Sequence, residues 1–340
     1  MKLYFLDLLR SCSAIYVVIY HLFQKINVHP ILKLLFSFGQ EAVIIFFVLS
    51  GFVIYYSVSE KKEITIKKYI KSRALRIYPI MIFSMMFSYL LFTLTNNFSI
   101  SFPIKSFLNN LFMLQDFSTG KPGTWVNPFM HNTPLWSLSY EWWFYMLFIF
   151  LYFYLSEKLS YWVAILTSII GLGLYLIIPN QIGLWFMYFI IWWFGVEIAK
   201  LYKSTSANNI SKRVIYISMT LIVILLVFIT IAVKMYYSGL ELQFGIYPIL
   251  FIRHFTLALI FGWFLIVFKN KLLQHFNKSN VLVLFAPYTY ALYVLHYPLL
   301  EFFIFKNWLN GLGVIFYVFI TFFIAYIVER YLQNFVKKRV

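Results

Sequence analysis

Several ionisable side chains of this sequence lie within apolar stretches of about 20 residues, long enough to cross a membrane as helices. An ionisable group near the bilayer centre costs about 2.5 to 3.5 kcal/mol, so each one needs a partner or a cavity. Counting about 1.5 Å of rise per residue predicts an outer polar layer of His21, Glu141, Arg253, His254 and His296. A histidine beside a carboxylate is well suited to remove a proton from a hydroxyl. His21 and Glu141 are therefore our first candidates for general-base chemistry.

A second group of charged residues lies toward the other end of these stretches. This predicted inner polar layer contains Asp7, Arg10, Arg73, Arg76 and Glu197. A guanidinium group binds phosphate through two parallel hydrogen bonds. The inner layer therefore favours a phosphate-bearing cofactor that arrives from this side.

Structural roles compete with these chemical ones. Buried histidines such as His254 and His296 are often hydrogen-bonded packing residues, and Glu141, which two tryptophans follow, could anchor a helix at the membrane interface. Arg73 and Arg76 are also explained as ordinary basic residues at the end of a transmembrane helix.

The composition identifies the environment in which these residues must be positioned. Of 340 residues, 62% are hydrophobic and 11% are charged, whereas about 25% are charged in an average soluble domain. Such a chain cannot cover a soluble globule with polar surface. Its net charge of +17 would suggest nucleic acid for a soluble protein, but here membrane topology explains it, and we expect no nucleic-acid partner.

The pattern of apolar stretches predicts an all-α integral membrane protein, a bundle of about ten transmembrane helices that forms a single domain over residues 1–340. The predicted spans are 6–24, 38–58, 77–95, 135–155, 161–178, 183–202, 214–233, 247–268, 281–303 and 312–331. The long segment between the third and fourth spans, 96–134, contains an apolar stretch at 104–114 that we expect to be a surface or re-entrant helix. Loops of this length are often lids or binding elements.

Loop charge predicts the orientation, because cytoplasmic loops are enriched in Lys and Arg. The loop after the second span holds Lys61, Lys62, Lys67, Lys68, Lys71, Arg73 and Arg76. Placing this loop inside also places inside Lys2, Lys158, Lys203, Lys212, Arg213, Lys271, Lys278, Lys337, Lys338 and Arg339. Both termini are therefore predicted to be cytoplasmic.

Five sequence blocks, in this order, resemble the signature of the membrane-bound acyltransferase type 3 family. They are Leu6-Asp7-Leu8-Leu9-Arg10 followed by His21, the Ser50-Gly51 element within residues 46–52, Arg73-Ala74-Leu75-Arg76, Leu135-Trp136-Ser137-Leu138-Ser139-Tyr140-Glu141, and residues 290–298 with His296. Each block alone is weak, but together they span most of the chain. Larger members carry an appended extracytoplasmic hydrolase-like domain, for which this sequence has no segment.

The resemblance implies an O-acyltransferase that moves an acyl group, most simply acetyl, from cytoplasmic acyl-CoA to a hydroxyl of an extracytoplasmic or lipid-linked glycan such as O-antigen, capsule or exopolysaccharide. It implies that Arg10, Arg73 and Arg76 bind the donor. His21 would be the general base or else a transient acyl carrier, and Glu141 would orient or balance a catalytic group.

His296 and Arg253 are the candidates for substrate binding on the acceptor side, and we expect no metal. The expected location is the plasma membrane or inner membrane of a bacterium, with the chain as a monomer or a homo-oligomer. Two alternatives remain open at this stage. The chain could be a transporter or flippase for a polysaccharide precursor, or a non-catalytic subunit of a polysaccharide synthesis complex.

Overall fold

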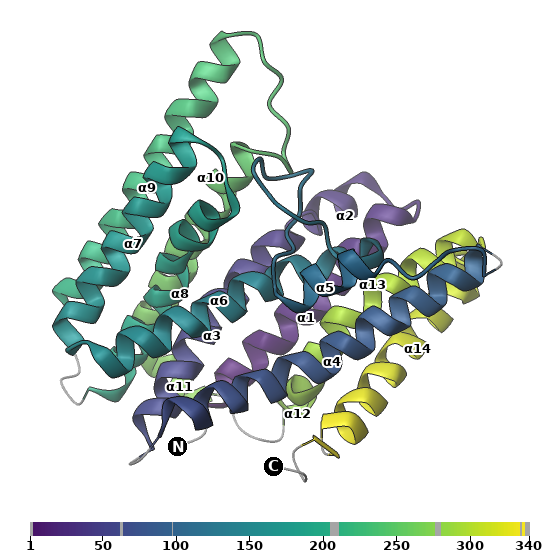
Figure 1. The fold of residues 1–340 in the computed structure, drawn as a ribbon, viewed down its shortest axis with the longest axis horizontal. Helices are drawn as coiled ribbons and strands as arrows, with labels where there is room; N and C mark the ends of the chain where they lie inside the picture. Colours follow the sequence, from purple (N-terminus) through teal and green to yellow (C-terminus); the bar gives the residue numbers. More distant parts are fainter. Residues whose placement is uncertain are drawn as a thin grey trace.

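The computed structural model describes residues 3–61, 64–96, 98–204, 211–275, 280–333 and 335–336, and within these ranges the chain forms helices and no strands. Its long helices form one bundle (Figure 1): α1 (Tyr4–Lys25), α3 (Gly39–Ser59), α4 (Ile66–Thr95), α6 (Trp136–Tyr154), α7 (Glu157–Ile177), α8 (Gln181–Lys203), α9 (Lys212–Tyr237), α10 (Ile249–Val267), α13 (Thr289–Phe305) and α14 (Gly311–Ile327). Shorter segments connect them: α2 (Pro30–Leu35), α5 (Ile104–Leu111), η1 (Phe129–His131), η2 (Thr133–Leu135), α11 (Lys269–His275), α12 (Val281–Phe285), η3 (Ala286–Tyr288) and η4 (Val328–Gln333).

The all-α membrane bundle predicted from the sequence is confirmed. Within the described ranges, nine helical stretches are long and apolar enough to cross a membrane. The predicted span at 135–155 forms α6, which is not among these nine, because Glu141 and several tyrosines and tryptophans lower its hydropathy. This helix packs against α3, α4, α7 and α8, so protein surrounds much of it. The surface helix expected at 104–114 is present as α5.

The beginning of α1 and the end of η4 lie at the same end of the bundle (Figure 1). This agrees with an even number of crossings, and the basic residues that begin α4 lie at this end too. The cytoplasmic location of this end stays a prediction from loop charge. Of the basic residues used for that prediction, Lys2, Lys62, Lys278 and residues 337–339 lie outside the described residues.

Helix α4 begins eleven residues before the predicted span at 77–95. The apolar stretch ends at the basic residues, but the backbone stays helical back to Ile66. The Thr65 side chain accepts a hydrogen bond from the Lys68 backbone N–H at 3.3 Å. Such a side-chain cap satisfies one of the free N–H groups at the start of a helix. Arg73 and Arg76 are therefore held on one regular helix that continues into the bundle.

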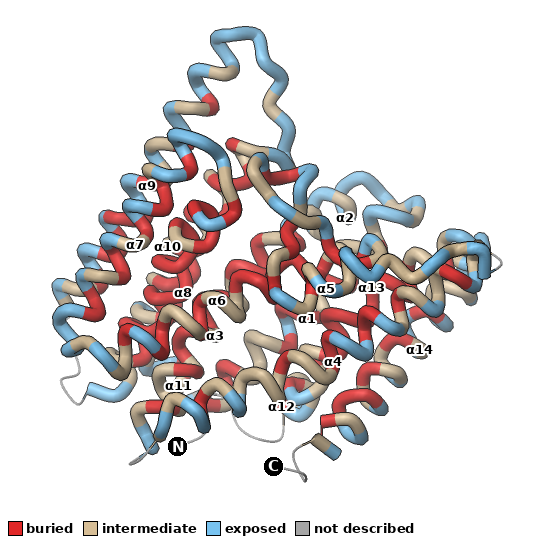
Figure 2. The backbone as a smooth tube through the Cα atoms, viewed as in Figure 1, coloured by how far each residue is buried: buried red, intermediate tan, exposed pale blue. Residues whose placement is uncertain are grey.

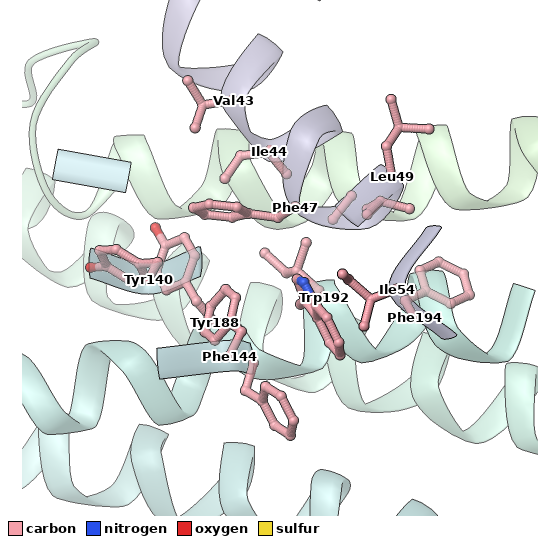
Figure 3. Packing of buried hydrophobic residues seen from close by; sticks show 14 of the residues in the cluster. Val43, Ile44, Phe47, Leu49, Ile54, Tyr140, Phe144, Tyr188, Trp192 and Phe194 are labelled. Carbon is pink, nitrogen blue, oxygen red and sulfur yellow. The ribbon is translucent and has the colours of Figure 1, made fainter. Parts of the chain in front are cut away.

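The centre of the bundle is the crossing of α3 and α8. A Cβ atom on Gly51 would lie 1.9 Å from the Trp192 carbonyl oxygen, and one on Gly195 would lie 1.9 Å from the Val48 carbonyl oxygen. Only glycine permits this approach of two backbones. Figure 3 shows Trp192 and the aromatic residues of α6 packed below α3.

The helix at the centre of the bundle is more buried than the helices at its edge. Helix α8 is buried along nearly its whole length, whereas α7, α9 and α14 carry many exposed apolar side chains on their outer faces (Figure 2). In a membrane protein such exposed apolar faces contact lipid.

Candidate functional site

A cavity lies among α1, α3, α4, α6 and α13. Its volume is about 420 Å³. Its polar lining residues are Arg10, Ser50, Ser72, Arg73, Arg76, Ser137, Glu141, Tyr145, Thr289, Tyr290, Tyr293 and Gln333. We call it the arginine cavity, because three arginines and one glutamate line it and leave it with a net positive charge.

Glu141 is held in place by side chains of α3 and α6. Its Oε1 atom accepts a hydrogen bond from Ser50 Oγ at 3.0 Å and one from the hydroxyl of Tyr145, one helical turn further along α6. Trp192 Nε1 in turn donates to Ser50 Oγ at 3.2 Å. The α3–α8 glycine crossing places Ser50 within reach of Trp192, so the core packing sets the position of the carboxylate.

The arginines have different surroundings. Arg76 forms an ion pair with Glu329 of η4 and lies over the Tyr290 ring, 5.3 Å from its centroid. Arg73 lies 5.9 Å from the ring centroids of both Tyr69 and Tyr145. Among the described residues, neither Arg73 nor Arg10 forms an ion pair with a carboxylate.

Charge that the protein itself leaves uncompensated in a cavity favours an anionic ligand. The structure brings Arg10, Arg73 and Arg76 together as predicted, because all three line the arginine cavity. Glu197, placed with them by sequence, instead pairs with Lys200 at 2.6 Å and accepts a hydrogen bond from Trp193, away from this cavity.

His21 does not line the arginine cavity. Its ring centroid lies 5.2 Å from that of His296 and 4.9 Å from that of Tyr297. Arg10 and His21 are eleven residues apart, so they share roughly one face of α1 and differ in depth by about 16 Å. That depth separates the histidine pair from the arginines.

The prediction that His21 and Glu141 lie together is not supported by this arrangement. No hydrogen bond of Glu141 involves a histidine in the described part of the chain, and its partners are Ser50 and Tyr145. Helical rise gives the depth of a residue but not the direction in which its side chain points. This is why depth alone grouped Glu141 with the wrong layer.

Tyr293 connects the two regions. It lines the arginine cavity, its hydroxyl shares a 2.9 Å hydrogen bond with Ser137 Oγ, and its ring lies 6.3 Å from that of His296. His296 Nδ1 lies 3.1 Å from the Leu292 carbonyl oxygen, and its buried Nε2 atom has no hydrogen-bond partner in the structure.

Arg253 lies outside the cavity and has a structural environment. Its Nε atom is 2.6 Å from Glu41 Oε1, and its guanidinium donates to the carbonyl oxygens of Phe244 and Ser37 at 2.6 and 3.2 Å. These contacts join the loops before α3 and α10. These contacts give Arg253 a structural role at these two loops, and its role in substrate binding stays a prediction.

A second buried charged cluster escaped the sequence analysis. Asp116 and Lys121, in the segment between α5 and α6, are fully buried, and Lys121 Nζ lies 3.0 Å from Asp116 Oδ1. Asp116 Oδ2 accepts hydrogen bonds from the Tyr140 hydroxyl at 2.6 Å and from Gln181 Nε2 at 3.1 Å. Lys121 Nζ also lies 3.6 Å from the ring centroid of Trp136. Burial lowers the pKa of Lys121, and the nearby Asp116 opposes that shift.

This Asp116–Lys121 cluster fixes the segment between α5 and α6 against the bundle. His254, which the sequence placed with His21, lies near it and shares a 2.7 Å hydrogen bond between Nδ1 and the Tyr188 hydroxyl. The cluster is not part of the arginine cavity.

Other site residues missed from the sequence are Ser50, Tyr145, Trp192, Ser137 and Tyr293. Ser50, Ser137 and Tyr293 were present in recognised blocks but had no role assigned to them. A polar residue directly before the glycine of an apolar span was the available signal for Ser50.

Comparison with known proteins identifies the family. A family model described as an acyltransferase domain matches residues 3–330. No curated protein and no solved structure matches the chain. The match covers nearly the whole sequence and includes every residue that lines the arginine cavity except Gln333. The chain belongs to the acyltransferase type 3 family.

Proposed function

We propose that this membrane acyltransferase moves an acyl group, most simply acetyl, from acyl-CoA on the cytoplasmic side to a hydroxyl of a glycan on the outer side. The observation that carries this proposal is the arginine cavity, which is lined by three arginines and by a carboxylate that hydrogen bonds hold in place. CoA is a polyanion, so a cavity with net positive charge at the basic end of the bundle suits it.

The reaction is an attack of the acceptor oxygen on the thioester carbonyl carbon. A C–O bond forms, the C–S bond breaks, and the proton of the acceptor hydroxyl is transferred to the departing thiolate through the enzyme. Negative charge develops on the carbonyl oxygen in the transition state, and cationic donors aimed at it are an effective source of stabilisation. Arg10 and Arg73, which have no carboxylate partner in the described part of the chain, are the cavity residues available for this role.

Glu141 has the role of a positioning carboxylate in this proposal. Ser50 and Tyr145 fix the carboxylate by hydrogen bonds, and this carboxylate offsets part of the positive charge of the arginines when no donor is bound. An anionic donor would supply a partner of opposite charge to Arg10 and Arg73, while Glu141 stays held by Ser50 and Tyr145.

His21 remains the candidate for contact with the acceptor, either as general base or as transient acyl carrier. Its place beside His296 and Tyr297, outward of the arginines, suits an acceptor that approaches from the outer side. Tyr293 marks the boundary where donor and acceptor would meet. Two substrates in separate compartments can thus react without either crossing the membrane.

The experiment combines an assay with product analysis. The purified protein in lipid nanodiscs receives acetyl-CoA and a bacterial surface glycan, and thiol release is measured with glycan mass. We expect thiol release that depends on the glycan and a mass increase of one acetyl group. Absence of thiol release with every glycan tested, together with unchanged surface polysaccharide in cells that lack the protein, would contradict the proposal.

A further inference from the structure

A second pocket lies at the predicted outer end of the bundle, between the end of α4 and the end of α13. Its volume is about 210 Å³, and Met130 of η1 also lines it. Its polar lining residues are Ser88, Thr95, Tyr297 and Glu301, and apolar or aromatic side chains make up the rest of the lining. We call it the outer pocket.

Tyr297 joins the outer pocket to the histidine pair. It lines the pocket, and its ring centroid lies 4.9 Å from that of His21. Lys25 is four residues after His21 on α1 and therefore lies on the same helix face. Its Nζ atom is 3.1 Å from Oε1 of Glu301. A ligand in the pocket therefore lies close to the side chain that we propose for contact with the acceptor hydroxyl.

The charge of the lining favours an uncharged ligand that carries hydroxyl groups. Glu301 is the only charged residue among the described residues that line the pocket, and its contact with Lys25 offsets its charge. The two side chains are 41% and 39% exposed, and an ion pair so open to solvent is weak. A carboxylate accepts hydrogen bonds and an ammonium group donates them, whereas a sugar hydroxyl does both. An anionic sugar would instead meet a carboxylate without surplus positive charge.

The size and the apolar part of the lining fit a single sugar ring. Sites for drug-sized ligands measure about 300 to 1,000 Å³ and are mostly apolar and aromatic, with a few polar groups that set orientation. The outer pocket is smaller and has the same composition, with Phe92, Phe302 and Tyr297 as aromatic lining residues. The arginine cavity, at about 420 Å³ and with three arginines, is larger and positively charged. The two spaces therefore suit different ligands.

We propose that the outer pocket binds one uncharged sugar ring of the acceptor glycan and that Glu301 accepts hydrogen bonds from the hydroxyl groups of this ring. This inference rests on the proposed function, which gives the reacting hydroxyl to His21 but does not say where the glycan is held. It assigns that binding to the ends of α4 and α13 and restricts the acceptor to glycans with a neutral sugar at this position. Glu301 binds the sugar and takes no part in proton transfer.

The test uses small sugars that compete with transfer from acetyl-CoA to a bacterial surface glycan in nanodiscs. The probes are methyl glycosides of glucose, galactose and mannose, and methyl glycosides of the matching uronic acids, which carry a carboxylate in place of the CH₂OH group. We expect at least one neutral glycoside to inhibit transfer and its uronic acid to inhibit it about tenfold less, as for one charged group left without a partner. Equal inhibition by both forms, inhibition by the uronic acids alone, or no inhibition by any probe would overturn the proposal.

Two variants place the competitor in the pocket. Glu301→Gln should raise the inhibition constant of the neutral glycoside and the KM for the glycan about tenfold, with kcat and the KM for acetyl-CoA unchanged. Its control is Glu241→Gln, because Glu241 is exposed in the loop after α9. Leu91→Trp fills the pocket and should act in the same way, whereas Leu90→Trp changes an exposed neighbour that does not line it. Equal effects of each variant and its control would show that the sugar does not bind there.

The apolar lining also fits a lipid chain, so the assay is repeated with a lipid-linked form of the glycan and with the glycan released from its lipid. A loss in Leu91→Trp that is confined to the lipid-linked form assigns the pocket to lipid and overturns the proposal, whereas an equal loss with both forms supports it. Normal kinetics of both Glu301→Gln and Leu91→Trp would overturn this inference alone. Absence of transfer to any glycan by the unmodified protein would overturn the proposed function and this inference together.

Discussion

The arginine cavity and the Asp116–Lys121 cluster both place charged side chains inside the bundle, but they compensate that charge in opposite ways. In the cluster, one lysine and one aspartate are in contact, every oxygen of the aspartate has a donor, and the side chains are fully buried. In the cavity, three arginines and one glutamate line a space of about 420 Å³. Buried charge that is fully paired stabilises structure, whereas buried charge left with room and without enough partners is available to a ligand.

The first prediction concerns the cavity and has the largest expected effect. Arg73→Ala removes a guanidinium that faces the reacting end of the donor, and we expect transfer to fall by about a hundredfold or more, as for loss of a group that stabilises transition-state charge. Arg76→Ala should be similarly inactive and also less stable, because it leaves Glu329 buried without its partner. Membrane insertion should stay normal, since the loop keeps its other basic residues. Thiol release and membrane abundance are measured together, and a Lys67→Ala control as inactive as Arg73→Ala would refute the specific role.

The second prediction concerns the cluster. Asp116→Ala leaves Lys121 buried without its carboxylate, and breaking a buried pair in this way costs about 3 to 5 kcal/mol of stability. We expect a lower melting temperature in detergent, with transfer per folded molecule nearly unchanged. The paired replacement Asp116→Leu/Lys121→Met should recover much of the lost stability, because it removes both charges at once. A folded Asp116→Ala protein with no transfer activity would mean that the cluster belongs to the active site.

We expect a third, smaller effect on transfer when a hydrogen bond that holds Glu141 is removed. Ser50→Ala removes one hydrogen bond to the carboxylate, so we expect kcat to fall about tenfold, in line with one charged hydrogen bond, while acetyl-CoA affinity stays the same. Ser168→Ala is the control, because Ser168 is buried but bonds only to its own helix in α7. An equal decrease in both variants would show a general packing effect.

The smallest effect on transfer is expected at Arg253. Arg253→Gln should lower stability by loosening the loops before α3 and α10, and it should leave KM for the glycan within about twofold, since its donors contact backbone and Glu41. A selective rise in glycan KM would restore the substrate-binding role predicted from the sequence.

The sequence predicted the helices of the bundle and the arginine group well. Long apolar stretches indicate membrane helices. Arg10, Arg73 and Arg76 lie close to the inner ends of the predicted spans, so their depth in the membrane could be estimated from the sequence. The start of α4 was misplaced, since a hydropathy scan ends at basic residues that the helix includes.

Side-chain direction and contacts between distant segments were harder to predict. Glu141 was grouped with His21 because both were counted to the same half of the bilayer, yet α6 turns Glu141 toward Ser50 of α3. Asp116 and Lys121 lie in a loop rich in glycine and proline, and nothing local shows that their partners come from α6 and α8. Such pairings depend on the folded positions of several helices at once.

We expect the donor to bind in the arginine cavity, apart from the histidine pair. Titration calorimetry of the purified protein with acetyl-CoA tests this, with His21→Ala and Arg73→Ala compared with the unmodified chain. We predict that His21→Ala binds acetyl-CoA within about twofold of normal, although it no longer transfers, while Arg73→Ala loses about tenfold or more in affinity. Normal binding by Arg73→Ala together with loss of binding by His21→Ala would mean that the donor binds at the histidine pair instead.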